Sequence, residues 1–330
     1  MKVPHSGYHW HSGADRFFEG WYYRITLPEV KQSFAFIYAI DDPQGGTKYS
    51  GGSMQVLGVD DQHIWRTLPN CRDFAANRES FDLSHWNSRG EGYTASDRHN
   101  QGKIYDPVQN LTCTWDYQIQ AVSHDQTATM GWLSYLPVFA PGWQILRLHG
   151  LGSGFVNWGD RRYEFINAPV YMEKNWGGAF PEQWFWLQCN AFGDHGNLSV
   201  ITAGGKRKTL GVSSDVAMVK IFYGGEIYSF MPENSEVYCE IMPWGSWQVR
   251  AYNSKGQRVE IIGKTEQKGT LVMVPTAAGL RFYCRDTALG RVRLTLEADG
   301  KSISAHSDQG AVEVGGAIWE ELWRFKSARI

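Results

Sequence analysis

The feature that most constrains the fold of this chain is an alternation of apolar and polar side chains at every second residue. In the segment 33–40, with the sequence SFAFIYAI, four side chains fall on one face of an extended strand: Phe34, Phe36, Tyr38 and Ile40. Period two is the repeat of a β-strand, because successive side chains point to opposite faces of a sheet. The sequence therefore predicts an all-β protein.

Similar segments recur along the chain and are separated by turn signals. Further strands are expected around 129–132, 184–191, 216–222, 237–242, 247–252, 258–262, 270–274, 280–284 and 291–297. The intervening clusters of Gly, Pro, Asn and Asp are typical of turns: 42–46, 204–205, 224–225, 243–245, 253–256 and 299–300. Many short strands at this spacing predict a barrel or a sandwich. Only 69–80 and 318–325 are expected to form short helices.

The length of 330 residues favours two domains, at roughly 150 residues for each. A weak internal repeat agrees with this. The segment Glu19–Trp21 precedes the aromatic strand 33–40, and the segment Glu173–Trp176 precedes the aromatic strand 184–191. The boundary is expected near the glycine-rich run 150–154, which gives an N-terminal domain of residues 1–155 and a C-terminal domain of residues 156–330.

Charge and cysteine content exclude several classes of function. The net charge is −2, so there is no basic excess for a nucleic-acid partner. No apolar run approaches the ~18 residues of a transmembrane helix, and the first residues do not form a signal peptide. The five cysteines are scattered and lack a CxxC pair, which argues against a disulfide framework or a thiolate zinc site. A reducing, cytoplasmic location is expected.

Aromatic residues are unusually frequent, at 14% of the chain, and they gather around one carboxyl group. The segment 17–23, FFEGWYY, places Glu19 among five aromatic residues. Burial beside apolar rings disfavours the charged form of a carboxyl group, and a protonated acid near pH 7 is what general acid catalysis requires. The alternative is an exposed glutamate at a strand end, or one paired with Arg16 or Arg24.

A second constellation combines the segment 171–177, YMEKNWG, with the strand that follows it. One face of that strand carries Trp184, Trp186, Gln188 and Asn190, and the other carries Phe185, Leu187, Cys189 and Ala191. A face that mixes indole rings with amides is typical of a ligand pocket. The alternative is a barrel interior in which the amides satisfy backbone groups.

Three histidines near the N-terminus, His5, His9 and His11, have spacings that a metal site can use. No carboxylate or cysteine cluster accompanies them, so no metal is expected, and hydrogen-bonded histidines or a contact to a bound hydroxyl are favoured. The tryptophans also leave a glycan-binding surface open. Glycoside hydrolysis would require two carboxyl groups at a defined separation, which a sequence does not show.

Nine segments taken together resemble the tocopherol cyclase family, nearly from end to end of the chain. They are PHSGYHW (4–10), FFEGWY (17–22), GWLSYLP (131–137), PGWQIL (141–146), YMEKNWG (171–177), FPEQWFWLQCN (180–190), LSVITAGG (198–205), CRDT (284–287) and EVGG (313–316). The chain starts at the first of these motifs, where plant members carry a transit peptide. It therefore resembles a bacterial, cyanobacterial member. More distantly, it is similar to acyclic carotenoid hydratases.

The resemblance implies a fold and a reaction. The fold is two lipocalin-like β-barrel domains with a few short helices. The reaction closes the chromanol ring of delta- or gamma-tocopherol from a 2-methyl- or 2,3-dimethyl-6-phytyl-1,4-benzoquinol. An acid protonates the alkene nearest the ring, and the phenol oxygen attacks the tertiary cation. This is an intramolecular, lyase-type ring closure with no net redox change, so no cofactor and no metal are implied.

Under this resemblance, Glu19 is the first candidate for the acid and Glu173 the second. The reason for this order is Lys174, because a salt bridge to the adjacent Glu173 would hold that carboxyl ionised. The alternative is that both support the scaffold and an aspartate donates the proton. Ring faces that stabilise the cation are expected from Trp21, Trp176, Trp184 and Trp186. Groups that hold the quinol hydroxyls are expected from His9, Tyr22, Lys174, Asn175, Gln188 and Asn190.

The substrate implied by the resemblance resides in membranes, so peripheral contact with a thylakoid or lipid-globule surface is expected. Three alternatives differ in what they predict. An isoprenoid double-bond hydratase would use the same acid in a wetter pocket. A non-catalytic lipocalin-like carrier would bind prenylquinones, and loss of either glutamate would not matter. A glycan-binding module would expose its tryptophans.

Overall fold

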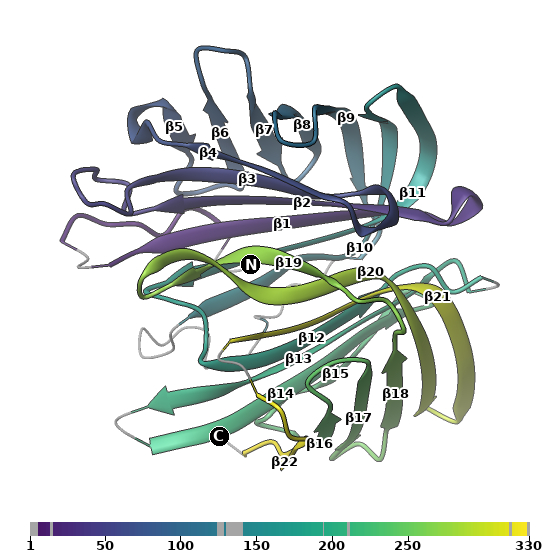
Figure 1. Ribbon diagram of the computed structural model, residues 1–330. Helices are drawn as coiled ribbons and strands as arrows, with labels where there is room; N and C mark the ends of the chain where they lie inside the picture. The colour runs from purple at the N-terminus through teal and green to yellow at the C-terminus, as the bar shows by residue number, and fades with distance from the viewer. Residues whose placement is uncertain are drawn as a thin grey trace. The chain divides into compact units, whose positions relative to one another are not determined.

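A computed structural model describes residues 6–13, 16–123, 129, 141–193, 195–209, 212–316 and 319–328, and most of them lie in β-strands (Figure 1). The all-β prediction is confirmed. The strands form two large, curled, antiparallel sheets. The motif at 131–137, the start of the motif at 4–10, His5 and most of the strand expected at 129–132 lie outside the described residues.

The first sheet has eleven strands in the order β4-β3-β2-β1-β11-β10-β9-β8-β7-β6-β5. Their bounds are β1 Phe18–Leu27, β2 Gln32–Asp41, β3 Gly51–Leu57, β4 His63–Leu68, β5 Phe74–Ala76, β6 Asp82–Trp86, β7 Gly92–Ser96, β8 His99–Asp106, β9 Leu111–Ala121, β10 Gly142–Trp158 and β11 Arg161–Gly177. Three short 3-10 turns connect them: η1 Pro28–Val30, η2 Val59–Asp61 and η3 Cys71–Asp73.

The second sheet also has eleven strands, of which ten follow the order β15-β14-β13-β12-β21-β20-β18-β17-β16-β22, while β19 pairs with β20 off this path. Their bounds are β12 Gln183–Cys189, β13 Leu198–Thr209, β14 Val212–Tyr223, β15 Glu226–Phe230, β16 Ser235–Ile241, β17 Ser246–Asn253, β18 Arg258–Lys264, β19 Thr270–Thr276, β20 Gly279–Ala298, β21 Lys301–Gly316 and β22 Trp323–Lys326.

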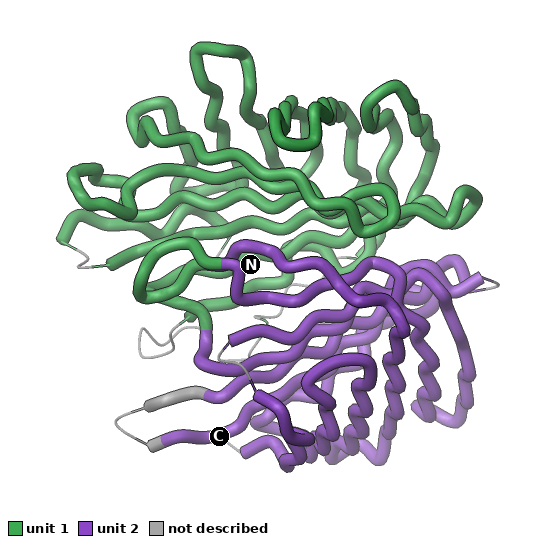
Figure 2. Tube along the Cα trace, viewed as in Figure 1, with its two compact units in different colours: residues 1–129, 140–180, 275–281 green, residues 130–139, 181–274, 282–330 purple. Residues whose placement is uncertain are grey.

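The chain forms two compact units (Figure 2). Unit 1 contains Met1–Thr129, Ala140–Phe180 and Pro275–Arg281, and unit 2 contains the other segments. The boundary expected near 150–154 lies inside strand β10, so these units divide the chain differently from residues 1–155 and 156–330. The assignment of domains stays a prediction.

Each sheet curls around its own apolar core, to which most of its strands contribute one apolar face. In unit 1 this face includes Trp21, Tyr23 and Ile25 of β1 and Val170 and Met172 of β11. In unit 2 it includes residues such as Phe185, Leu187 and Cys189 of β12.

A glycine allows one close contact between neighbouring strands of unit 1. Gly154 has a φ of +153°, and an added Cβ would lie 2.2 Å from the carbonyl oxygen of Asp116. A larger residue at this position would force β10 and β9 apart. The register of β10 against β11 also shifts between Gly152 and Gly154, so the glycine lies at an irregularity of that pairing.

Both predicted helices are wrong. In the segment 69–80, only Cys71–Asp73 forms a 3-10 turn, and Phe74–Ala76 then enters the sheet as β5. The Asn70 side chain accepts the Arg72 N–H and so favours a turn over a helix. In the segment 318–325, Ile318 lies outside the described residues, and the last residues, from Trp323, belong to β22, which pairs with β16. Trp323 is buried in the core of unit 2, so packing decides the conformation.

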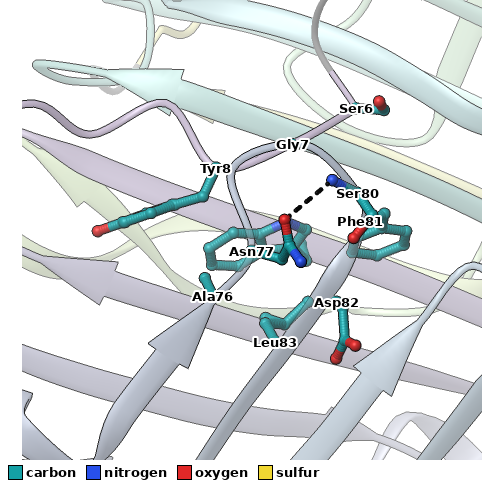
Figure 3. A pocket seen from close by; sticks show the side chains of 10 residues that line it. Ser6, Gly7, Tyr8, Ala76, Asn77, Ser80, Phe81, Asp82 and Leu83 are labelled. Carbon is teal, nitrogen blue, oxygen red and sulfur yellow. Dashed lines mark hydrogen bonds between the residues drawn. The ribbon is translucent and has the colours of Figure 1, made fainter. Parts of the chain in front are cut away.

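A small hollow lies in unit 1, between the N-terminal segment Ser6–Tyr8 and the segment from Ala76 to Leu83 (Figure 3). Asn77 caps the turn there, since its side chain accepts the Ser80 N–H at 3.3 Å. The empty space is about 140 Å³, open solvent included. Pockets for drug-sized ligands have roughly 300–1,000 Å³. This hollow is therefore too small for a large ligand.

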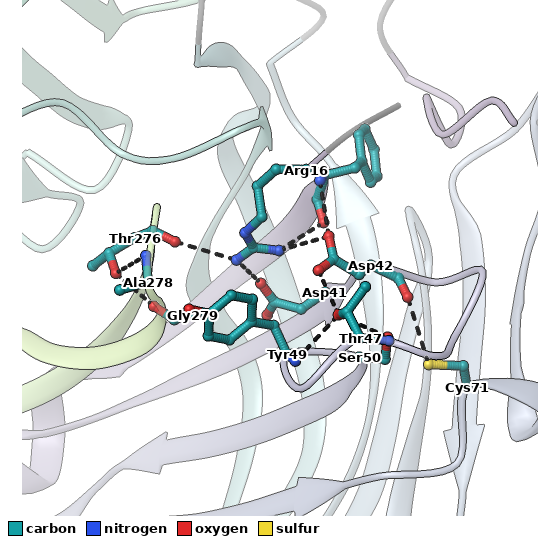
Figure 4. A network of polar contacts seen from close by, with 11 residues as sticks. Arg16, Asp41, Asp42, Thr47, Tyr49, Ser50, Cys71, Thr276, Ala278 and Gly279 are labelled. Carbon is teal, nitrogen blue, oxygen red and sulfur yellow. Dashed lines mark hydrogen bonds and ion pairs between the residues drawn. The ribbon is translucent and has the colours of Figure 1, made fainter. Parts of the chain in front are cut away.

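An arginine ties three segments of unit 1 together (Figure 4). The Arg16 guanidinium forms ion pairs with Asp41 and Asp42, and it donates to the carbonyl oxygen of Thr276 at 3.3 Å. Burial raises the pKa of Asp41 to about 6, although Arg16 acts in the opposite direction. Burial also disfavours the charge of Asp42, but hydrogen bonds from the Phe17 N–H, Thr47 and Arg16 prevail and hold its pKa below the usual range.

The raised pKa of Asp41 predicts a pH-dependent stability. The folded chain binds the proton of the Asp41 carboxyl group more tightly than the unfolded chain does. Protonated Asp41 therefore adds to the free energy of unfolding below about pH 4, and this contribution is lost as the pH rises through about 6. The substitution Asp41→Asn removes this titration. Urea unfolding between pH 4 and 7 should show the stability of the native chain, relative to the variant, falling up to about pH 6 and then levelling. A constant difference across this range would contradict the prediction.

Candidate active site

The antiparallel pairing of β1 with β11 brings the two glutamate motifs together in unit 1. In this register Glu19 lies opposite Trp176, Trp21 opposite Lys174, and Tyr22 opposite Glu173. Because side chains alternate along a strand, the pairing splits the motifs between two faces of one sheet. Glu19, Trp21 and Lys174 lie on the core-facing side. Tyr22 and Glu173 lie on the other side.

On the core-facing side, Glu19 forms a buried ion pair with Lys174. The Lys174 Nζ lies 2.6 Å from Glu19 Oε1, and both side chains are fully buried. Lys174 also donates to the carbonyl oxygen of Gly7. The His9 N–H donates to Glu19 Oε2 at 2.8 Å, and the imidazole stacks on Trp176 with centroids 4.0 Å apart. The ion pair thus fixes the N-terminal segment against the sheet.

This arrangement corrects the expected Lys174–Glu173 salt bridge. Adjacent residues of a strand point to opposite faces, so Lys174 reaches across to Glu19 instead. Burial lowers the pKa of Lys174, and the charge of Glu19 and its hydrogen bond act against this. Burial also lowers the pKa of His9, in part offset by the hydrogen bond to Glu19. The groups around Glu19 are therefore engaged in holding the fold.

On the opposite side of the same strands, two aromatic side chains hold Glu173. The Tyr171 hydroxyl donates to Glu173 Oε2 at 2.6 Å, and the Trp143 indole N–H donates to the same oxygen at 3.0 Å. Glu173 is 7% exposed and Tyr171 is fully buried. The Tyr22 ring meets the Tyr171 ring edge to face, with centroids 6.4 Å apart. A buried carboxyl group thus lies among phenol and indole rings.

The other predicted residues of unit 1 fall into the same two groups. Trp21 packs in the apolar core of the unit. Trp176 stacks on His9 and has the Lys174 ammonium 5.2 Å from its ring centroid. Asn175 is half-buried, and alternation along β11 places it on the same face as Glu173. The predicted set therefore makes two separate clusters on the two faces of one sheet.

Unit 2 contains the predicted residues of strand β12. Trp184, Trp186, Gln188 and Asn190 are all buried, and they lie outside the apolar core, which takes up Phe185, Leu187 and Cys189 instead. Within β12 the predicted division into two faces is thus confirmed, whereas Asn190 and Ala191 follow the end of the strand. The Trp184 indole donates to Glu313 of β21, which lies opposite Trp186.

The sequence analysis did not single out four residues at these clusters. Trp143 and Tyr171 hold Glu173, while Glu313 and Asp286 face each other across β21 and β20. All four lie within motifs of the family resemblance, at 141–146, 171–177, 313–316 and 284–287. Their position in these motifs was therefore the sequence signal that could have identified the four residues. What the sequence lacked was the pairing of the strands.

The described residues contain no group of three or more His, Cys, Asp or Glu side chains arranged to hold a metal ion. Among the same residues, no helix has the length and hydropathy needed to cross a membrane.

Comparison with known proteins gives a consistent result. A family model described as tocopherol cyclase-like matches residues 15–316. A probable chloroplastic tocopherol cyclase of Oryza sativa subsp. japonica is 35% identical, over 98% of this chain and 80% of that protein. A chloroplastic tocopherol cyclase of Zea mays is also 35% identical, with the same coverage.

Solved structures share the fold at low sequence identity. A putative AttH of Nitrosomonas europaea has a TM-score of 0.53 at 12% identity, covering 96% of this chain and 99% of that one. Kievitone hydratase of Nectria haematococca has a TM-score of 0.51 at 11% identity, covering 91% and 89%.

The buried pair predicts a specific stability pattern. Glu19→Gln or Lys174→Met alone leaves one buried charge without its counter-charge, and each should reduce the free energy of unfolding by about 3–5 kcal/mol. The double variant removes both charges and should cost less than the sum of the two. Urea denaturation of the three variants checks this. Additive losses would show that the two side chains act independently.

Proposed function

The chain belongs to the tocopherol cyclase family and is a ring-closing enzyme, and we propose that its substrate is a 2-methyl- or 2,3-dimethyl-6-phytyl-1,4-benzoquinol. The family model and the two plant relatives support a prenylquinol substrate. The observation that carries the proposed chemistry is the buried Glu173 carboxyl, held by Tyr171 and Trp143.

In the proposed reaction, protonated Glu173 donates its proton to the alkene nearest the quinol ring. The π electrons form the new C–H bond, and the tertiary carbon becomes a cation. A lone pair of the phenolic oxygen forms the C–O bond that closes the six-membered ring. The phenol proton then leaves and restores the carboxylic acid. Substrate and product are isomers, so atoms and electrons balance without an electron carrier.

We prefer Glu173 to Glu19 as the proton donor because of their partners. Glu19 is paired with Lys174 at 2.6 Å and accepts the His9 N–H, so this carboxyl group is engaged in holding β1, β11 and the N-terminal segment together. Glu173 accepts hydrogen bonds from two neutral donors, the Tyr171 phenol and the Trp143 indole, and both reach Oε2.

The surroundings of Glu173 also fit a cationic intermediate. The rings of Tyr22, Tyr171 and Trp143 lie around the carboxyl group, and one favourable cation–π contact contributes about 0.5–2 kcal/mol. Exclusion of water matters as well, since water would trap the cation as an alcohol. Asn175, on the same face, is the proposed contact for a quinol hydroxyl.

The remaining predicted residues keep narrower roles. Trp184, Trp186, Gln188 and Asn190 of unit 2 stay proposed substrate contacts, on the strength of their buried, mixed aromatic and amide face. His9, Trp21, Lys174 and Trp176 surround Glu19, and we propose that they support the fold. The hollow of Figure 3 is too small for a phytyl chain.

A phytyl chain partitions strongly into lipid, so we propose that the enzyme meets its substrate at a membrane or lipid-globule surface. In a cyanobacterium this surface would be the thylakoid.

The reaction predicts incorporation of one solvent hydrogen into carbon. The purified enzyme, incubated in D₂O with reduced 2,3-dimethyl-6-phytyl-benzoquinol, should form a chromanol with one carbon-bound deuterium, as read by mass spectrometry. An alcohol carrying one extra water would instead support the hydratase alternative. Tight binding without product, where a known cyclase turns the substrate over, would support the carrier.

Substitutions at the carboxyl group test its role. Glu173→Gln removes the acidic proton and should lower kcat by about 10²–10⁴-fold, the usual contribution of a general acid. Tyr171→Phe removes one orienting hydrogen bond and should lower kcat by about tenfold. Full activity of Glu173→Gln, with activity lost in Glu19→Gln at a temperature where that variant is folded, would reverse the assignment.

A further inference from the structure

The hairpin of β19 and β20 carries an unusual set of exposed apolar side chains. Leu271 is 53% exposed, Phe282 45% and Tyr283 44%. Phe282 and Tyr283 are consecutive residues of one strand, so partly exposed apolar side chains lie on both of its faces. Within the described residues, β19 pairs with β20 off the main path of the sheet. The hairpin is therefore an arm that exposes apolar surface.

The arm is continuous with a tryptophan of unit 2. The Trp244 indole donates to the carbonyl oxygen of Gln267 at 2.7 Å, just before β19. The Arg285 guanidinium of β20 lies 5.4 Å from the centroid of the Trp244 ring. A Cβ added to Gly269 would lie 2.4 Å from that ring and 2.8 Å from the Arg285 side chain. These contacts place Trp244, Gly269 and Arg285 against one another.

Alternation extends this contact along both strands. Tyr283 lies two residues before Arg285 and so continues the same side of β20, while Leu271 lies at the start of β19, two residues beyond Gly269. Met242, 41% exposed, lies two residues before Trp244. We name the set of Met242, Trp244, Leu271, Phe282 and Tyr283 the arm patch.

Positive charge accompanies the arm patch. Lys264, Lys268 and Arg285 are all exposed. The nearby acid, Glu266, is engaged with Arg291 at 2.6 Å. Basic residues are attracted to anionic lipid headgroups, and the amphipathic rings of Trp and Tyr favour the boundary between water and lipid. Exposed leucine and phenylalanine gain free energy by entering the acyl region.

We propose that the arm patch docks the enzyme on an anionic lipid surface. The proposal rests on the proposed function, because a phytyl-quinol substrate is held in lipid. The positive charge of Lys264, Lys268 and Arg285 favours lipids with negatively charged headgroups. The second possibility is that the arm patch contacts another copy of this chain, and the experiment is designed to separate the two.

The test is co-sedimentation of the full-length chain with lipid vesicles, in the absence of substrate. Vesicles of phosphatidylcholine alone are compared with vesicles that also contain phosphatidylglycerol. The native chain should bind the anionic vesicles, and binding should weaken as salt is raised. Leu271→Ser with Tyr283→Ser should reduce binding at least tenfold. Lys268→Gln should reduce it about fivefold, as expected for one basic residue near the surface.

Matched controls come from exposed apolar residues of unit 1. Val108 is 92% exposed and Ile166 84% exposed, and Val108→Ser with Ile166→Ser removes two apolar side chains without touching the arm patch. This variant should bind like the native chain. Thermal unfolding shows whether each variant is folded. Turnover of substrate in detergent micelles should be unchanged in the arm variants, because detergent delivers the quinol without a bilayer.

Each outcome decides the inference. Equal binding of native and arm variants, no binding of the native chain, or equal loss in the unit 1 control would overturn it. A dimer in sedimentation velocity that Leu271→Ser with Tyr283→Ser abolishes, without vesicle binding, would show that the patch serves a second copy of this chain. Vesicle binding is measured without turnover. A failed cyclase assay would therefore leave this result standing, and the two proposals fail separately.

Discussion

The buried ion pair between Glu19 and Lys174 is the interaction on which the candidate site depends. It joins β1 to β11 across 155 residues of sequence, and it fixes which residues of the two strands lie opposite one another. A slip of β11 by one residue against β1 would turn every side chain of β11 to the other face. Glu173 would then exchange faces with Lys174. The Glu19–Lys174 pair takes no part in the proposed chemistry, but it helps to determine on which face of the sheet Glu173 lies.

Two glutamates in similar sequence surroundings acquire different properties from their neighbours. Both lie among aromatic residues, and both are buried. One has an ammonium group and a backbone N–H as partners, so its charge is compensated inside the sheet. The other accepts hydrogen bonds from a phenol and an indole, which orient the carboxyl group. Our proposal therefore separates the two carboxyl groups by the environment on each face of one sheet rather than by residue type.

Period two was sufficient to predict the all-β class and strands such as β2, β12 and β17, because alternation is a local property that survives in the folded state. It did not single out the strands between residues 51 and 121, nor β10, β11 and β21. The two faces of β12 followed from it directly. The helix expected at 69–80 failed because the capping side chain of Asn70 and sheet pairing outweigh weak helical propensity. The partners of Glu19 and Glu173 could not be derived, since Lys174 and Trp143 reach them only through strand pairing. A single sequence contains no record of register, and that is where the expected salt bridge went wrong.

The contacts of Arg16 with Asp41, Asp42 and Thr276 have a consequence for biosynthesis. The contact with Thr276 spans 260 residues, and the segment Pro275–Arg281 is part of unit 1, whose other segments end at Phe180. A ribosome makes the chain from its N-terminus. Unit 1 therefore lacks its last segment, Pro275–Arg281, until most of unit 2 has been translated. Unit 1 therefore cannot complete its folding before most of unit 2 has been synthesised. A fragment ending at Phe180 would contain every strand of the first sheet and still lack the hairpin tip that Arg16 holds.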